Sequence, residues 1–259
     1  MKVMGQGPAV LMLHSSLSSH KQWSMLANQL ATDYQLFLPD LAGYGAQPAP
    51  AADQIASYRL EQEAALILAA LPDAIKAKPL VVIGHSFGGA VALHLARTGL
   101  LQVRQLFLFE PVAFHLLAAA TDTLSQQLCQ EVQQLAAQMQ LVDAWQAAQL
   151  FVDYWQQADY FQHLPQRMQQ QMTAQVGKVA ADFTALLQEP ATLAQYQQIN
   201  YPVLLLTGAQ SRGPALRISE LLASIWPQAV CQQLPTGHMG PVTDPTLVNP
   251  RFLQFLATA

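Results

Sequence analysis

A serine between two glycines, at the end of an apolar run, is the feature that most restricts how this chain can fold. The run Leu80–Ile83 leads directly into Gly84-His85-Ser86-Phe87-Gly88, and small residues follow. This order predicts a strand, a tight turn and a helix. Glycine two positions before and after Ser86 permits a strained turn that exposes the hydroxyl, and the helix amino terminus stabilises negative charge beside it. The segment therefore predicts that Ser86 is the nucleophile of a serine hydrolase.

Short apolar runs alternate with helical patterns along much of the chain. Helices are predicted at Trp23–Ala31, Tyr58–Leu71 and Phe87–Arg97. The predicted strands are Ala9–Leu13, Gln35–Leu38, Leu80–Ile83, Leu106–Phe109, Val203–Thr207 and Val230–Leu234. Such alternation is typical of an α/β fold, a mostly parallel sheet of about six or seven strands with helices on both faces.

The alternation stops between residues 111 and 200, where the sequence is rich in glutamine and has no strand pattern. Apolar residues recur there at helical spacing after a helix-capping residue, Thr121 or Asp122. They are Leu124, Leu128, Val132, Leu135 and Met139. We therefore predict an α/β core formed by residues 1–110 and 201–259, with residues 111–200 inserted as a helical cap.

The composition excludes several classes of function. Apolar residues make up 52% of the chain and charged residues 11%, and the net charge is −4 without a run of Lys or Arg. This favours a large core and argues against binding to nucleic acid or to an anionic membrane. No apolar run is long enough to span a membrane, and Met1–Leu13 lacks the parts of a signal peptide. Cys129 and Cys231 are far apart in the sequence, which predicts reduced thiols, no metal site and a cytoplasmic location.

A serine nucleophile needs a base and donors for the oxyanion. His238 lies between two glycines after the last predicted strand, so its loop can extend over the sheet edge towards Ser86. The backbone N–H of Phe87, which follows the nucleophile, is the first predicted oxyanion donor. The second is predicted at Ser16, within the small-residue loop that follows the first apolar run.

These motifs together resemble the α/β-hydrolase fold family over nearly the whole chain. The resemblance is carried by the loop at His14, Asp40-Leu41-Ala42-Gly43-Tyr44-Gly45, the Ser86 turn and Gly237-His238. It implies an oxyanion loop, a structural turn, a nucleophile and a base, and no metal or cofactor. Two departures are Ser15, where the family has glycine, and the few residues before Ala9. The second departure implies that the usual amino-terminal hairpin is truncated.

A third departure concerns the acid of the triad. The family usually has aspartate in a Gly-x-x-Asp pattern after the strand that matches Val203–Thr207, but this chain has Ser211 there. Loss of that carboxylate can cost about 10⁴ in kcat. Glu110 directly follows the predicted strand Leu106–Phe109 and provides a carboxylate one strand away from the usual acid position. Some family members carry their acid at that strand end. We therefore predict Ser86, His238 and Glu110 as the triad, with Glu110 within about 3.2 Å of His238 Nδ1.

The predicted reaction is hydrolysis of a carboxylic ester of a small, apolar molecule through an acyl-enzyme. The alternatives are hydrolysis of a C–C bond or a thioester by the same triad, and a relative that binds ligands without catalysis. Haloalkane dehalogenation would need a carboxylate where Ser86 stands. The residues predicted to line the substrate site all lie in the cap, and they are Phe114, Leu117, Phe151 and Trp155. The oligomeric state is left open.

Overall fold

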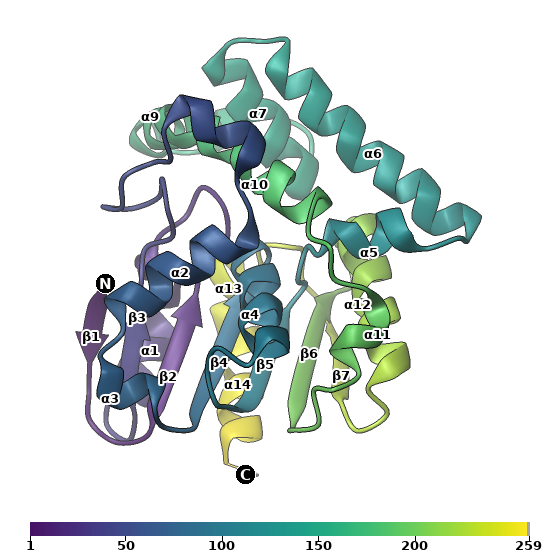
Figure 1. Ribbon diagram of the computed structural model, residues 1–259. Helices are drawn as coiled ribbons and strands as arrows, with labels where there is room; N and C mark the ends of the chain where they lie inside the picture. Colours follow the sequence, from purple (N-terminus) through teal and green to yellow (C-terminus); the bar gives the residue numbers. More distant parts are fainter. Residues whose placement is uncertain (258–259) are drawn as a thin grey trace.

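A twisted seven-stranded sheet forms the centre of the computed structural model, which describes residues 1–257 (Figure 1). The strand order is β1-β3-β2-β4-β5-β6-β7, and only β1 is antiparallel to its neighbour. The strands are β1 (Lys2–Met4), β2 (Ala9–Leu13), β3 (Gln35–Leu38), β4 (Leu80–His85), β5 (Val103–Phe109), β6 (Val203–Gly208) and β7 (Val230–Leu234). The α/β prediction is confirmed, and β1, the strand before β2, has three residues.

Consecutive strand residues belong to two separate cores, because side chains alternate between the faces of a sheet. Val82 and Leu108 pack into one hydrophobic cluster, whereas Val81 and Phe107 pack into the other. Both faces are therefore buried, which explains why the strands read as continuous apolar runs and do not alternate with polar residues.

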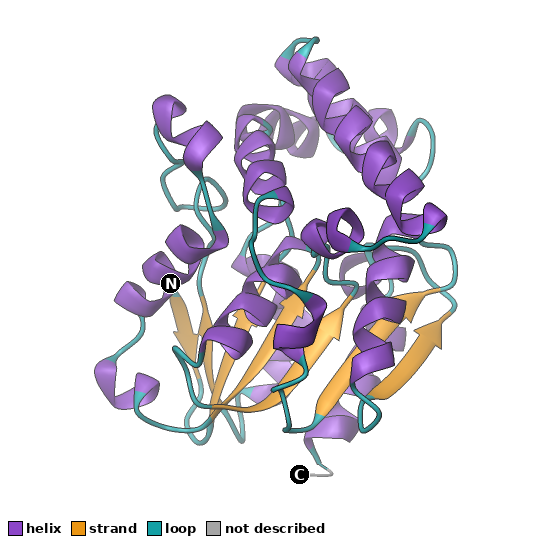
Figure 2. Cartoon of the chain, turned by 45° about the vertical axis from the view of Figure 1, so that its right-hand side comes forward, coloured by secondary structure: helices purple, strands orange, loops and turns teal. Residues whose placement is uncertain are grey.

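Helices cover both faces of the sheet, and Figure 2 shows them in front of and behind the strands. Residues of α1 and α14 pack on one face, and residues of α2, α4 and α12 on the other. The helices outside the β5–β6 segment are η1 (His20–Trp23), α1 (Ser24–Leu30), η2 (Ala52–Ser57), α2 (Leu60–Ala70), α3 (Asp73–Lys76), α4 (Phe87–Thr98), α12 (Gly213–Ile225), α13 (Gly240–Thr243) and α14 (Pro245–Leu256).

The segment between β5 and β6 is helical, and its helices α6, α7 and α9 lie above the carboxyl ends of the strands (Figure 1). Asp122, one of the two predicted capping residues, accepts a hydrogen bond from the Ser125 N–H at 2.9 Å. The helices are α5 (Phe114–Ala119), α6 (Thr123–Gln140), α7 (Ala144–Trp155), α8 (Tyr160–His163), α9 (Gln166–Gln175), α10 (Gly177–Leu187) and α11 (Leu193–Tyr196). The division into core and cap stays a prediction, and its residues 258–259 lie outside the described chain.

Two further findings concern the described residues 1–257. None of their helices combines the length and the apolar character needed to cross a membrane. They contain no group of three or more His, Cys, Asp or Glu side chains arranged to hold a metal ion.

Candidate active site

The turn between β4 and α4 holds Ser86 in a backbone conformation that L-residues rarely adopt, with φ 55° and ψ −119°. Its N–H donates to the Phe109 carbonyl at 3.1 Å, which fixes the turn to β5. A Cβ on Gly84 would lie 2.6 Å from the Gly88 carbonyl, and one on Gly88 would lie 2.4 Å from the His14 carbonyl. The two glycines are therefore required because backbone from three segments meets at this turn.

A continuous chain of hydrogen bonds joins three of the predicted site residues. Ser86 Oγ lies 2.9 Å from His238 Nε2, and His238 Nδ1 lies 2.6 Å from Glu110 Oε2. The second distance is within the limit of about 3.2 Å expected from the sequence. Since Nδ1 carries the proton donated to Glu110, Nε2 is left as an acceptor for the serine hydroxyl. The arrangement can move a proton from Ser86 to His238.

Glu110 is fully buried, and both of its carboxylate oxygens have partners. Oε2 accepts from His238, while Oε1 accepts from the Gly208 N–H at 2.6 Å. Its own backbone has a φ of 45°, and its N–H donates to the Leu206 carbonyl at 3.0 Å. The carboxyl ends of β5 and β6 therefore hold this carboxylate in one orientation.

Ser211 stands in the family's usual acid position and takes no part in this arrangement. It is half-buried, and among the described residues its hydroxyl has no hydrogen-bond partner. Glu110 thus supplies the only carboxylate hydrogen-bonded to the His238 ring within residues 1–257.

His85 supports the histidine loop, a role that the sequence did not suggest. Its Nε2–H donates to the His238 carbonyl at 2.8 Å, and the two ring centroids are 5.2 Å apart. Burial and the neighbouring His238 lower the pKa of His85 well below its usual range, so this ring stays neutral. Its position next to Ser86 could have suggested a contact with the loop of His238, but not a hydrogen bond to the His238 carbonyl.

The loop after β2 approaches the turn from the other side. Ser15 donates from its N–H and its hydroxyl to Gln22 Oε1, at 3.1 and 2.9 Å, and Ser16 lines the same cavity as Ser86. Leu17 follows with a φ of 53°. The predicted second donor, Ser16, therefore lies in a tightly held loop beside Ser86.

His14, at the start of this loop, makes folding sensitive to acid. Its Nδ1–H donates to the Ser15 carbonyl at 2.7 Å, and its Nε2 accepts from the Leu41 N–H at 2.9 Å. Burial is the main cause that lowers the pKa of His14 to about 4. Between about pH 6.5 and 4 the unfolded chain therefore binds a proton that the folded chain does not, and stability falls as the pH falls.

We expect His14→Gln to weaken this pH dependence. His14 should account for about 2 kcal/mol of the unfolding free energy lost between about pH 7 and 5, from the 1.36 kcal/mol that one pKa unit represents. Urea unfolding of both proteins at the two pH values measures the difference. An identical loss in the variant would contradict the assignment to His14.

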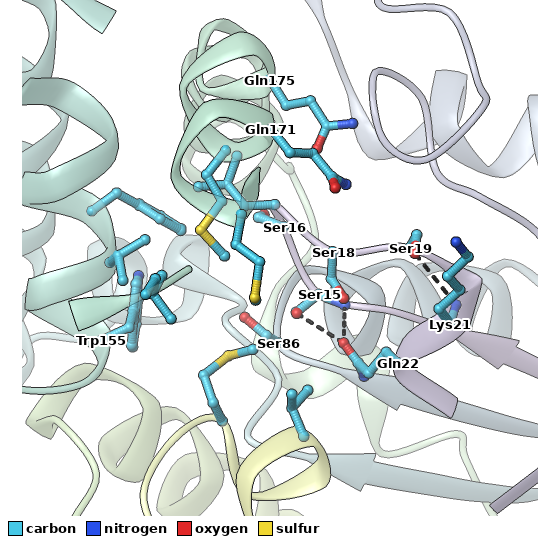
Figure 3. A pocket seen from close by; sticks show the side chains of 18 of the residues that line it. Ser15, Ser16, Ser18, Ser19, Lys21, Gln22, Ser86, Trp155, Gln171 and Gln175 are labelled. Atoms are coloured by element: carbon cyan, nitrogen blue, oxygen red, sulfur yellow. Dashed lines mark hydrogen bonds between the residues drawn. The ribbon is translucent and has the colours of Figure 1, made fainter. Parts of the chain in front are cut away.

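A cavity of about 620 Å³ opens above Ser86 and His238. Figure 3 shows Ser86 at its floor, Gln171 and Gln175 of α9 on one side and Ser18, Ser19 and Lys21 on the other. Its apolar walls come mainly from the helices above the sheet. They include Phe151, Val152, Trp155, Leu164, Met168, Met172, Met239 and Val242. The volume lies within the range of about 300–1,000 Å³ that is typical of small-molecule sites.

The four predicted substrate-lining residues fall in different places. Phe151 and Trp155 line this cavity, and the Trp155 ring stacks on His238 with centroids 4.2 Å apart. Phe114 lines only a second, much smaller cavity of about 10 Å³, which Ser86 also borders. Leu117 lines neither cavity, because its side of α5 is fully buried in the hydrophobic core.

The contribution of α9 was missed from the sequence. Met168 and Met172 of α9 lie one turn apart on the wall of the larger cavity. A spacing of four residues is typical of one face of a helix, but it does not tell whether that face meets the core or Ser86.

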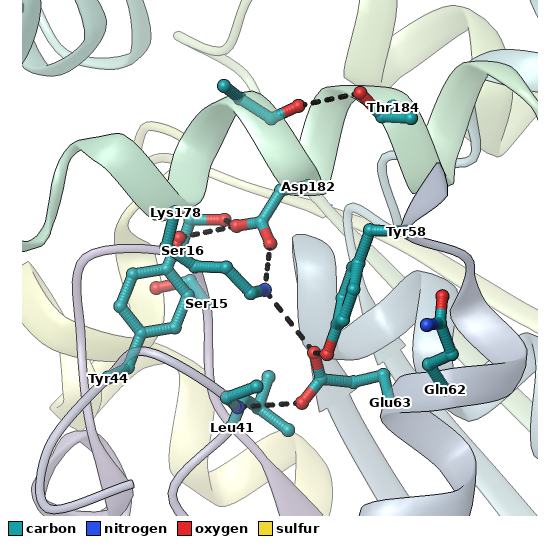
Figure 4. A network of polar contacts seen from close by, with 12 residues as sticks. Ser15, Ser16, Leu41, Tyr44, Tyr58, Gln62, Glu63, Lys178, Asp182 and Thr184 are labelled. Carbon is teal, nitrogen blue, oxygen red and sulfur yellow. Dashed lines mark hydrogen bonds and ion pairs between the residues drawn. The ribbon is translucent and has the colours of Figure 1, made fainter. Parts of the chain in front are cut away.

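A buried ion-pair cluster lies next to the loop after β2 (Figure 4). The Lys178 ammonium contacts the carboxylates of Asp182 and Glu63, and the latter contact measures 3.3 Å. Although burial opposes the charge, these two carboxylates raise the pKa of Lys178 above its ordinary value. Tyr58 donates to Glu63 at 2.9 Å, and Tyr44 donates to Asp182 at 2.5 Å. The cluster joins α10 to α2 and to the loop after β3.

We expect Lys178→Met to destabilise the protein strongly. The substitution keeps an apolar stem but leaves Asp182 and Glu63 buried without a cation, a change that typically costs about 3–5 kcal/mol. Lys76→Met is the matched control, because its partner Asp73 is exposed, and it should cost far less. Urea unfolding of both variants tests this, and equal stability of the two variants would contradict it.

Comparisons with known proteins agree with this fold. A family model described as the alpha/beta hydrolase fold matches residues 8–245. A solved hydrolase from Pseudomonas aeruginosa PA01 superimposes with a TM-score of 0.79 at 23% identity, covering 98% of this chain and 92% of that one. The enol-lactonase from Burkholderia xenovorans LB400 gives a TM-score of 0.77 at 17% identity over 99% of this chain and 95% of its own. At these identities the likeness shows the fold alone.

Curated relatives match a shorter segment. Lipase LipV of Mycobacterium tuberculosis is 40% identical over 106 residues, which is 40% of this chain and 38% of that protein. The pimeloyl-[acyl-carrier protein] methyl ester esterase of Chromobacterium violaceum is 36% identical over 95 residues, 37% of this chain and 34% of that protein. The chain thus spans less than two fifths of the length of these relatives. Because the family model covers nearly the whole sequence, the chain belongs to the alpha/beta hydrolase fold family.

Proposed function

We propose that this protein is a serine hydrolase that cleaves carboxylic esters through a covalent acyl-enzyme. The observation that carries the proposal is the hydrogen-bonded chain from Ser86 through His238 to Glu110, which opens on the cavity of about 620 Å³. A serine, an oriented histidine and a buried carboxylate in this order are the groups that acyl transfer requires.

In the proposed mechanism, His238 Nε2 takes the proton of Ser86 as Oγ attacks the ester carbonyl. The backbone N–H groups of Phe87 and Ser16 stabilise the oxyanion, each worth about 2.7–4 kcal/mol in the transition state. Glu110 holds the Nδ1 proton and stabilises the imidazolium that forms. His238 then protonates the departing alcohol, activates a water molecule and returns the proton to Ser86 when the acid is released.

The cavity supports an uncharged, largely apolar substrate. Its walls are aliphatic, aromatic and methionine side chains, and its polar groups are mainly hydroxyls and amides. Among the described residues, Lys21 is the one lysine that lines it, and the ring of His20, which also lines it, is paired with Asp40 at 2.8 Å. The names of LipV and of the methyl ester esterase support an ester over a thioester or a C–C bond. We propose no cofactor, nucleic-acid partner or membrane partner, and a cytoplasmic location.

A substrate panel tests the proposal. Wild-type protein is offered short aliphatic esters, the corresponding thioesters and a vinylogous diketone, with Ser86→Ala as the background. We expect turnover of the esters to exceed that of the other two classes. A preference for thioester or diketone would reassign the reaction, and binding of esters without turnover would support the non-catalytic alternative.

A further inference from the structure

Ser16, the proposed second oxyanion donor, is held by a residue from the helical segment above the sheet. Its hydroxyl donates to Asp182 Oδ2 at 2.6 Å, although the two residues are 166 positions apart in the sequence. Asp182 is buried in α10 and also accepts from Tyr44. Figure 4 shows Ser16, Tyr44 and Lys178 around this one carboxylate. The loop beside the nucleophile is therefore attached to α10 through a side chain.

The loop needs such an attachment because its backbone is strained. Leu17 has a φ of 53°, a conformation that is unfavourable for a branched side chain and persists only where the surroundings impose it. Ser15, two residues before Leu17, donates two hydrogen bonds to the Gln22 side chain of η1. Ser16, directly before Leu17, donates one to Asp182. Side chains thus join the loop to η1 through Gln22 and to α10 through Asp182.

The charges around Asp182 are arranged so that its carboxylate can lie near the reaction centre. Asp182 borders the small cavity together with Ser16 and Ser86, where an unbalanced negative charge would oppose a developing oxyanion. The Lys178 ammonium contacts Asp182 and lies 4.6 Å from the centroid of the Phe87 ring. The cation therefore contacts both the carboxylate and the side chain of the residue whose N–H is the first proposed donor.

We propose that Asp182, kept in place by Lys178, is a positioning residue that fixes the Ser16 backbone N–H for the oxyanion. This inference rests on the proposed function. It assigns to α10 a part in the chemical step, since the second donor is correctly placed only while α10 is docked on the loop. An N–H displaced by about 1 Å can cost on the order of 100-fold in rate, even though the group itself is still present.

Ser16→Ala tests the proposal without disturbing the ion pairs, because it removes the hydroxyl and keeps the backbone N–H. We expect kcat for a short ester to fall about 10- to 100-fold with KM nearly unchanged. Ser16→Thr, which keeps a hydroxyl, should restore most of the rate. The rate of phosphonylation by a fluorophosphonate should follow kcat in each variant, since that reaction uses the same donors.

Asp182→Asn and Tyr58→Phe complete the design. Asp182→Asn should lower kcat, and the double variant with Ser16→Ala should lose no more than the larger single loss, because both changes act through one contact. Tyr58→Phe is the control: it removes a hydrogen bond from the Glu63 side of the same cluster and does not contact Ser16. Its kcat should equal that of the wild type.

Three results would overturn the inference. Wild-type kcat and phosphonylation rate in Ser16→Ala would show that the contact positions nothing. An equal fall of kcat in Tyr58→Phe would show a general loosening of the joint between α10 and the core. A wild-type protein that neither hydrolyses esters nor reacts with the fluorophosphonate would contradict the proposed function itself, and this proposal with it.

Discussion

Ser86→Ala is expected to lower kcat for ester hydrolysis about 10⁶-fold, the loss typical of removing the nucleophile from a triad that acts as a unit. His238 and Glu110 cannot form an acyl-enzyme without the serine oxygen, so only transition-state binding remains. Steady-state assays with an active wild-type reference measure the loss. A variant within about tenfold of the wild-type rate would place the chemistry elsewhere.

The loss should be specific to catalysis. The alanine introduced by Ser86→Ala would occupy the same backbone conformation as the serine, whose φ is 55°, and the hydrogen bond from the backbone N–H to Phe109 would remain. We therefore expect the urea midpoint to stay close to that of the wild type. This control separates a missing nucleophile from a misfolded turn.

Glu110→Gln is expected to lower kcat about 10⁴-fold while leaving the shape of the site nearly unchanged. Both carboxylate oxygens accept hydrogen bonds, one from His238 and one from the Gly208 N–H. A glutamine can accept only one of the two, because its other terminal atom is an NH₂ donor. With its oxygen towards Gly208, the NH₂ faces Nδ1 and forces the ring proton onto Nε2. The histidine can then no longer accept the proton of Ser86.

In the opposite orientation, the glutamine oxygen faces His238 and the NH₂ faces the Gly208 N–H. Two donors then meet in a buried place, which destabilises the folded protein. Glu110→Asp is the matched control because it keeps the charge and shortens the side chain by one methylene. We expect Glu110→Asp to retain more activity than Glu110→Gln. If Glu110→Gln kept nearly the full rate, the acid would have to come from another residue.

The sequence was sufficient for the parts of the site that depend on the sheet. Parallel strands bring their carboxyl ends to one edge, so Ser86 after β4, Glu110 after β5 and the loop of His238 after β7 had to meet there. The predicted strands were found because the apolar runs are short and are bounded by turn residues. Glu110 could be proposed because a carboxylate directly after four apolar residues is costly to bury without a partner.

The parts that depend on helix orientation could not be predicted. Leu117 and Phe151 both lie on apolar helix faces, but one packs into the core and the other lines the cavity. An apolar helix face predicts only that the face is covered, and it does not predict what covers it. The contact between Ser16 and Asp182 joins residues 166 positions apart and has no local signal.

Mass spectrometry of the protein after reaction with a fluorophosphonate tests the central claim most directly. We expect one adduct per chain, on the tryptic peptide that ends at Arg97 and contains Ser86, with ester hydrolysis lost in proportion to labelling. The adduct should be absent from Ser86→Ala. A protein that hydrolyses esters while Ser86 stays unmodified, or that carries its adduct on another residue, would contradict the account.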